Sequence, residues 1–196
     1  MTEEFKVLKL VEPTSPILYE KMQPFSFEHP PCDPVELANN LITTMNHHNG
    51  MGLSANQCGL PYRVFVMRSN PTKVCFNPRV IDVSSEEVSL DEGCLSFPFL
   101  FVKIKRPAFI KVRYTDAYGE THTEKFIGMT ARCFLHEMDH LEGINFTNRA
   151  NIALLERAKR QQAKVLKRVK AGQRVINNQN YVKGGLSNET ISTTQA

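Results

Sequence analysis

Two histidines four residues apart give the chain its clearest chemical signal. They belong to the run His136-Glu137-Met138-Asp139-His140, which has the pattern HExxH. On a helix, residues four apart lie on one face with Cβ atoms about 5–6 Å apart, so both imidazoles can bind one metal ion. Glu137 then lies beside the open coordination position as a base. The alternative is a chance occurrence of this pattern on an ordinary amphipathic helix.

The third ligand decides the class of such a site. A metzincin protease would have a third histidine where this chain has Phe146, and a thermolysin-like protease would take a glutamate from a following helix, where the only acid is Glu156. Upstream, Cys94 follows a glycine within a β-rich region, so its thiolate could reach the metal. The alternative for Cys94 is the usual fate of a free cysteine, a small buried apolar residue.

A third candidate segment is the run Gly50-Met51-Gly52-Leu53-Ser54-Ala55-Asn56-Gln57. Its two glycines let the backbone approach a ligand closely. The amide of Gln57 offers two N–H donors and a carbonyl acceptor on one short arm. The alternative is a plain helix end and a loop that leads into the next strand.

The elements around these segments predict an α+β fold, with a central helix against short, mainly antiparallel strands. Prolines keep the first thirty residues extended, and Asp33-Pro34 begins a helix that ends at Asn49-Gly50. Further helices are predicted over about 130–142 and 151–170. Strands are predicted over 62–67, 74–80, 101–104, 108–114 and 121–127.

The net charge of +4 hides an asymmetry along the 196 residues. Residues 149–174 carry nine of the 24 basic residues and one of the 20 acidic residues, so the rest of the chain has a net charge of −4. This basic helix is either a contact for a polyanion or a solvated helix with extended Lys and Arg side chains. The segment 177–196 is rich in Asn, Ser, Thr and Gly and is expected to be flexible.

The cysteines and the hydropathy indicate a cytoplasmic protein. Five cysteines without CxxC spacing argue against a disulfide framework and for a reducing compartment. The N-terminus lacks the apolar region of a secretory signal, and no apolar run approaches the length that spans a bilayer. We therefore expect no membrane partner, and no DNA partner either.

Taken together, the three segments resemble the signature set of peptide deformylases. GMGLSANQ, EGCLS and HEMDH occur in the family's order, and the resemblance covers roughly residues 5–148. Those enzymes remove the N-formyl group from the N-terminal formylmethionine of nascent polypeptides and release formate. The resemblance implies a peptide-deformylase-like catalytic domain over 1–148, followed by a basic C-terminal helix over 149–176 and the tail over 177–196.

The resemblance also implies residue roles. Cys94, His136 and His140 would bind one divalent metal ion, Fe(II) in most members, with Ni, Co or Zn accepted. Glu137 would be the general base, and the Gln57 amide with the Leu95 backbone N–H would bind the oxyanion. The candidates for substrate binding are Met51, Gly52, Glu92, Gly93, Met129 and Cys133. For Met51, Met129 and Cys133 the alternative is ordinary core packing.

Two residues depart from the family's usual pattern. Ser54 stands where the first motif usually has alanine, and its hydroxyl needs a partner in a packed turn. Arg132 lies one turn before His136, where some members have an aliphatic residue. It either forms an ion pair with Glu92 or lies on the solvent face.

Two other readings remain open from the sequence. A zinc peptidase would use the same HExxH helix and base. A binding module without catalysis would use its basic segment on RNA or ribosomes. Ribosome contact through residues 149–174 is also compatible with catalysis, because deformylases act on nascent chains.

Overall fold

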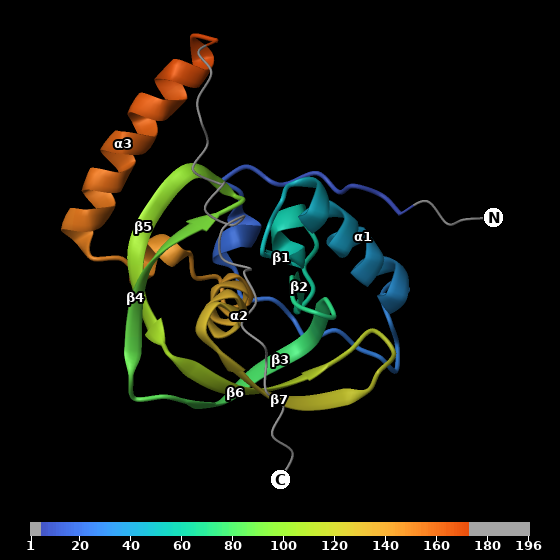
Figure 1. Cartoon of the computed structure of the whole chain (residues 1–196). Coiled ribbons are helices and arrows are strands. Elements are labelled where there is room, and N and C mark those ends of the chain that lie inside the picture. Colours follow the sequence, from blue (N-terminus) through green and yellow to red (C-terminus); the bar gives the residue numbers. More distant parts are fainter. Residues whose placement is uncertain (1–4, 173–196) are drawn as a thin grey trace.

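The computed structural model describes residues 5–172, in which two antiparallel sheets enclose a central helix. In Figure 1 this helix, α2, lies at the centre, with β4 (Glu87–Cys94) and β5 (Phe97–Pro107) on its left and the strands β3 (Lys73–Val83), β6 (Phe109–Thr115) and β7 (Thr121–Ile127) of the larger sheet below it. The helices are α1 (Pro34–His47), α2 (Gly128–Leu141) and α3 (Ile152–Lys170). Three short 3-10 turns cover Pro16–Tyr19, Ala55–Cys58 and Phe146–Arg149.

The larger sheet has five strands in the order β1-β2-β3-β6-β7, and each neighbouring pair is antiparallel. Its strands are β1 (Gly52–Ser54), β2 (Val64–Met67), β3 (Lys73–Val83), β6 (Phe109–Thr115) and β7 (Thr121–Ile127). The second sheet is the hairpin of β4 (Glu87–Cys94) and β5 (Phe97–Pro107). The antiparallel α+β fold predicted from the sequence is confirmed.

Helices cover both faces of the larger sheet, which explains why all four residues of β2 are buried. Val64 and Val66 pack in the cluster of α1, while Phe65 and Met67 pack in the cluster of α2. Alternate side chains point to opposite faces of a strand, so a strand between two helices is apolar throughout. The central strands therefore fix α2 against the sheet.

The start of α1 follows from its sequence. The Asp33 side chain accepts hydrogen bonds from the backbone N–H groups of Val35 and Glu36, both at 2.8 Å, and Pro34 occupies the first helical position. The helix buries Leu37, Leu41 and Met45 against the sheet.

Most predicted elements are present, with two additions. The three long helices and the five predicted strands lie within a few residues of their expected positions. Strands β1 and β4 were not predicted, and the segment after Gly50, for which a plain loop was the alternative, contains both β1 and a 3-10 turn. The prediction for residues 177–196 lies outside the described residues.

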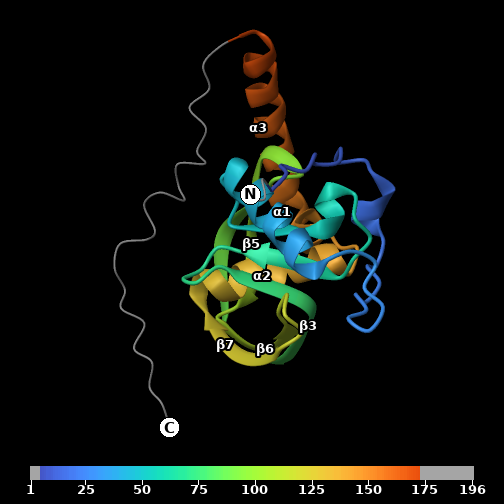
Figure 2. The same cartoon turned by 90° about the vertical axis from the view of Figure 1, so that its right-hand side faces the viewer.

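Helix α3 extends away from the body, as the turned view in Figure 2 shows. It packs against β5. The amide of Gln162, in the middle of α3, donates a hydrogen bond to the carbonyl oxygen of Pro98, near the start of β5, at 2.8 Å. In the described part of the chain, no helix combines the length and apolar character needed to cross a membrane.

Candidate metal centre

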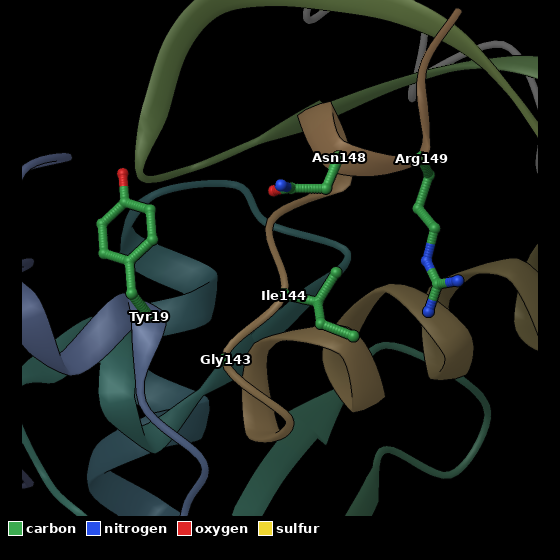
Figure 3. Close-up of a pocket in the computed structure, with 5 residues that line it drawn as sticks. All are labelled: Tyr19, Gly143, Ile144, Asn148 and Arg149. Carbon is green, nitrogen blue, oxygen red and sulfur yellow. The ribbon is translucent and has the colours of Figure 1, made fainter.

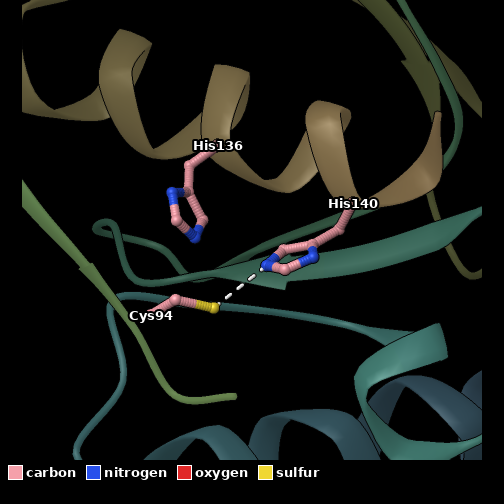
Figure 4. Close-up of side chains that lie close together, drawn as sticks. All are labelled: Cys94, His136 and His140. Carbon is pink, nitrogen blue, oxygen red and sulfur yellow. Dashed lines mark hydrogen bonds between the residues drawn. The ribbon is translucent and has the colours of Figure 1, made fainter. Parts of the chain in front are cut away.

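The three predicted metal ligands come together although up to 46 residues separate them in the chain. Figure 4 shows Cys94, at the end of β4, facing His136 and His140 on α2. One donor atom of each lies within 4.8 Å of the others, and Cys94 Sγ lies 3.2 Å from His140 Nε2. One sulfur and two imidazole nitrogens form a donor set that suits Fe, Ni, Co or Zn.

The protonation of Cys94 favours metal binding. Burial alone would raise the pKa of its thiol, but His140 and His136 outweigh this effect and hold the pKa well below its usual range. The thiolate is the form of cysteine that binds metals. Donor identity, geometry and charge therefore all fit a transition-metal ion at this point.

Glu92 orients one of the two imidazoles. Its Oε2 lies 3.3 Å from His136 Nδ1, so the Nδ1–H donates to the carboxylate and Nε2 faces Cys94 and His140. Arg106 donates to Glu92 through Nε at 3.0 Å and Nη2 at 2.9 Å. Burial alone would raise the pKa of Glu92, but the hydrogen bonds from His136 and Arg106 lower it to about 2. Glu92 therefore stays ionised.

Arg132 is the second cation on Glu92, which decides between the two alternatives for this residue. It is 4% exposed, and its Nη1 lies 2.5 Å from Glu92 Oε1. It also donates to the carbonyl oxygens of Ile104 and Val88. Arg132 thus ties α2 to both strands of the β4–β5 hairpin, which carries Cys94.

Arg106 and Asp139 form buried ion pairs behind the candidate metal centre, and this role was not predicted from the sequence for either residue. Asp139 accepts from Arg106 Nη1 at 2.6 Å and from Arg149 Nη2 at 2.7 Å. A signal for Arg106 was present, because it continues the alternation of inward-facing residues along β5 after Val102 and Ile104. A buried arginine in that register needs an anionic partner.

Gln57 is held in a fixed orientation beside the ligands. The Ser54 backbone N–H donates to its side-chain oxygen at 2.9 Å. Its Nε2 donates to Ser96 Oγ at 3.0 Å and lies 3.4 Å from Cys94 Sγ. The amide N–H groups therefore face the candidate metal centre, with Leu95 next in sequence to Cys94.

Glu137 lies beside the same centre and is 3% exposed. Burial raises the pKa of its carboxyl group above the usual range. Ser54 Oγ lies 2.6 Å from Glu137 Oε2, so the hydroxyl at this departure from the family pattern has found its partner. A buried carboxyl group of raised pKa is suited to accept and return a proton.

The candidate substrate residues occupy different positions. Cys133 is buried, and its Sγ lies 3.3 Å from the Met51 carbonyl oxygen, which links α2 to the start of β1. Met129 is 46% exposed at the first turn of α2. Gly93 faces Phe101 across the hairpin, and a Cβ there would lie 2.5 Å from that ring.

Two other features among the described residues lie apart from this centre. Figure 3 shows a cavity of about 300 Å³ near the end of α2, lined by Tyr19, Gly143, Ile144, Asn148 and Arg149. A second group of potential ligands, Asp116, Glu120 and His122, lies at the turn between β6 and β7. Hydrogen bonds to Asp116 from two backbone N–H groups and from His122 account for that turn without an ion.

Comparison with known proteins places the chain in a family. The family model described as polypeptide deformylase matches residues 7–155. The chain belongs to the peptide deformylase family. It is a hydrolase that removes the N-formyl group from nascent peptides, and the family is metal-dependent. The family rules out the metzincin and thermolysin-like readings.

Individual relatives agree. A peptide deformylase of Christiangramia forsetii is 34% identical over 161 residues, which cover 73% of this chain and 81% of the relative. The crystal structure of peptide deformylase from Thermotoga maritima matches with a TM-score of 0.71 at 34% identity, covering 74% of this chain and 99% of that one. The enzyme from Synechococcus elongatus in complex with actinonin gives 0.72 at 28% identity, over 86% and 87% of the two chains.

Proposed function

We propose that Cys94, His136 and His140 hold the metal ion of this deformylase, and that it is iron(II) in the native enzyme. The observation that carries the proposal is the convergence of three donor atoms within 4.8 Å, one of them a thiolate. When bound, the ion would polarise the formyl carbonyl and lower the pKa of a water molecule. Zinc, nickel or cobalt also suit this donor set.

In this proposal Glu137 is the general base. Its buried carboxylate takes the proton of the attacking water and later gives it to the departing amine, which becomes the free N-terminus of the methionine. The raised pKa of Glu137 brings its proton affinity closer to neutral pH, where both transfers are efficient.

Gln57 and Leu95 bind the charge that develops on the formyl oxygen. The Gln57 side-chain oxygen is already anchored by Ser54, so its N–H groups face the substrate site, where the oxyanion would replace Ser96 Oγ or Cys94 Sγ as the acceptor of one of them. With the Leu95 backbone N–H they form a pair of donors for the oxyanion. Loss of one such donor typically costs about 100- to 1000-fold in rate.

The peptide would bind as an added strand between the segments of Gly52 and Gly93, with Glu92 fixed behind them. Backbone pairing accepts many sequences beyond the first residue. Met51, Met129 and Cys133 would contact the methionine side chain. The exposure of Met129 leaves it free to cover a bound side chain.

The basic helix α3 would contact the ribosome, and the enzyme would act in the cytoplasm. Arg157, Arg160 and Lys164 are exposed and share one face of this helix. Binding to ribosomal RNA would weaken steeply with salt. Cosedimentation of the parent with ribosomes should therefore exceed that of a variant with Arg160→Glu and Lys164→Glu. Equal cosedimentation of the two proteins at every salt concentration would contradict the contact.

The test of the activity is formate release from formyl-Met-Ala-Ser by protein purified without air, with elemental analysis of the same sample. We expect about one metal ion per chain and rapid formate release. Acetyl-Met-Ala-Ser is the matched control, because a site shaped for the formyl group excludes the extra methyl. Cleavage of internal peptide bonds without formate release would instead indicate a peptidase.

A further inference from the structure

We propose that the hydroxyl of Ser54 is a positioning group for Glu137: it holds Oε2, so that Oε1 is the oxygen that exchanges protons. This inference rests on the proposed role of Glu137 as general base. Ser54 ends β1 and is fully buried, and Glu137 lies on α2, 83 residues further along the chain.

The hydrogen bond between Ser54 and Glu137 is short, and among the described residues no other donor reaches this carboxylate. Ser54 Oγ lies 2.6 Å from Glu137 Oε2, a distance typical of a hydroxyl that donates to a carboxylate. Within residues 5–172, no other group forms a hydrogen bond with the Glu137 carboxylate. The base therefore depends on this one donor for its orientation.

The opposite side of the carboxylate is fixed by packing. A Cβ at Gly52 would lie 2.4 Å from Glu137 Oε1, so the absence of a side chain there makes the space that this oxygen occupies. Oε2 is thus held by the Ser54 hydroxyl and Oε1 faces Gly52, in the segment where the substrate strand is proposed to pair. The two oxygens have different surroundings and hence different tasks.

The hydroxyl also has a second acceptor within reach. The backbone carbonyl oxygen of Glu137 lies 3.3 Å from Ser54 Oγ. When Oε1 carries a proton, Oε2 remains an acceptor, so the Ser54 hydroxyl continues to donate to Oε2 and the longer contact with the carbonyl is secondary. Ser54 can therefore hold Glu137 in place throughout the proton transfer.

Residue 54 also connects the base with the proposed oxyanion donor. Its backbone N–H anchors the Gln57 side-chain oxygen, while its side chain anchors Glu137. The backbone contact is retained when the side chain changes, so a substitution of Ser54 by alanine removes the donor to Glu137 and leaves the anchor of the Gln57 side-chain oxygen in place. Alanine is smaller and introduces no clash.

The kinetic test compares Ser54→Ala with Ser84→Ala at equal metal content. Ser84 also has a hydroxyl with two hydrogen bonds, to the Glu86 carbonyl and from the Phe109 N–H, but it lies in the turn after β3. We expect Ser54→Ala to lower kcat about 10-fold while KM for formyl-Met-Ala-Ser changes less than about two-fold. Ser84→Ala should keep the parental kcat. A parental kcat in Ser54→Ala, or a loss confined to KM, would overturn the proposal.

A second readout does not depend on activity. In the metal-loaded protein, Ser54→Ala should lower the Tm by about 4 °C, because a buried carboxylate loses the one donor it has among residues 5–172. In a Glu137→Ala background the same substitution should shift the Tm by less than half as much. Equal shifts in the two backgrounds would show that Ser54 contributes only packing and would overturn the proposal. Failure of Glu137 as the base is distinguishable, because Glu137→Ala would then remain active.

Discussion

The space at Gly52 gives a prediction whose size follows from the structure. In Gly52→Ala the new Cβ would lie 2.4 Å from Glu137 Oε1 and 2.8 Å from its Cδ. A carbon and an oxygen that are not bonded rarely approach closer than about 3.0 Å, so the carboxylate must retreat by about 0.6–1 Å. The backbone at Gly52 is not in the left-handed region, and alanine therefore adds no backbone strain.

A displacement of a catalytic group by about 1 Å costs on the order of 100-fold in rate. We therefore expect kcat of Gly52→Ala to fall about 30- to 100-fold, which corresponds to about 2.0–2.7 kcal/mol of transition-state stabilisation. The metal ligands lie on other segments, so metal content should stay at the parental value. The assay is formate release at saturating formyl-Met-Ala-Ser, with the metal measured in the same samples.

Gly50→Ala is the matched control two residues earlier. Its Cβ would meet the end of the Leu95 side chain at 2.9 Å, which can move away, and the Gly52 carbonyl oxygen at 3.1 Å, which needs a shift of only a few tenths of an ångström. We expect this variant to keep kcat within about three-fold of the parent. If Gly52→Ala also kept its kcat within that range, the position of the Glu137 carboxylate would not limit the reaction and its role as base would be refuted.

Three further predictions concern the base, the buried ion pairs and the pH dependence of stability. Glu137→Ala should retain metal and fold but lose about 100-fold or more in kcat, and near-normal formate release would exclude it as the base. Arg132→Met should lower the free energy of unfolding in urea by about 3 kcal/mol, because Glu92 and two carbonyl groups lose a buried donor. An unchanged urea midpoint would show that Arg106 alone is a sufficient partner for Glu92. Burial alone would raise the pKa of Glu124, but hydrogen bonds from Tyr114 and Lys73 outweigh it and lower the pKa. Its contribution to stability is therefore present above the ordinary pKa of a glutamate side chain and is lost as the pH falls through the lowered value. Measured by urea unfolding, the free energy of unfolding of Glu124→Gln should be about 1 kcal/mol lower than that of the parent at pH 7, and it should change less between about pH 5 and 3. Parallel curves of unfolding free energy against pH for the two proteins would contradict this.

The sequence was sufficient for the features that depend on local spacing. The spacing of two histidines four residues apart predicts a helix, and α2 carries both of them on the face toward Cys94. The cap of α1 at Asp33 and the strand alternation of β6 and β7 are likewise local signals. Each of these elements was predicted within a few residues of its observed bounds.

Features that depend on partners distant in the chain were not accessible in the same way. Strand β4 has serine and acidic residues along its length and is a strand because it pairs with β5. The acceptor of the Ser54 hydroxyl lies 83 residues further along the chain. The sequence left open whether Arg132 pairs with Glu92 or faces solvent, and the structure shows the ion pair. Arg106 alone offered an unused local signal, its inward register on β5.

The most direct test of the central claim is X-ray absorption at the metal edge of the zinc-substituted enzyme, for the parent and for Cys94→Ser. We predict one sulfur at about 2.3 Å and two imidazole nitrogens at about 2.0–2.1 Å from the metal in the parent, with the sulfur lost in the variant. A metal surrounded only by nitrogen and oxygen in the parent, or a sulfur that persists in Cys94→Ser, would contradict it.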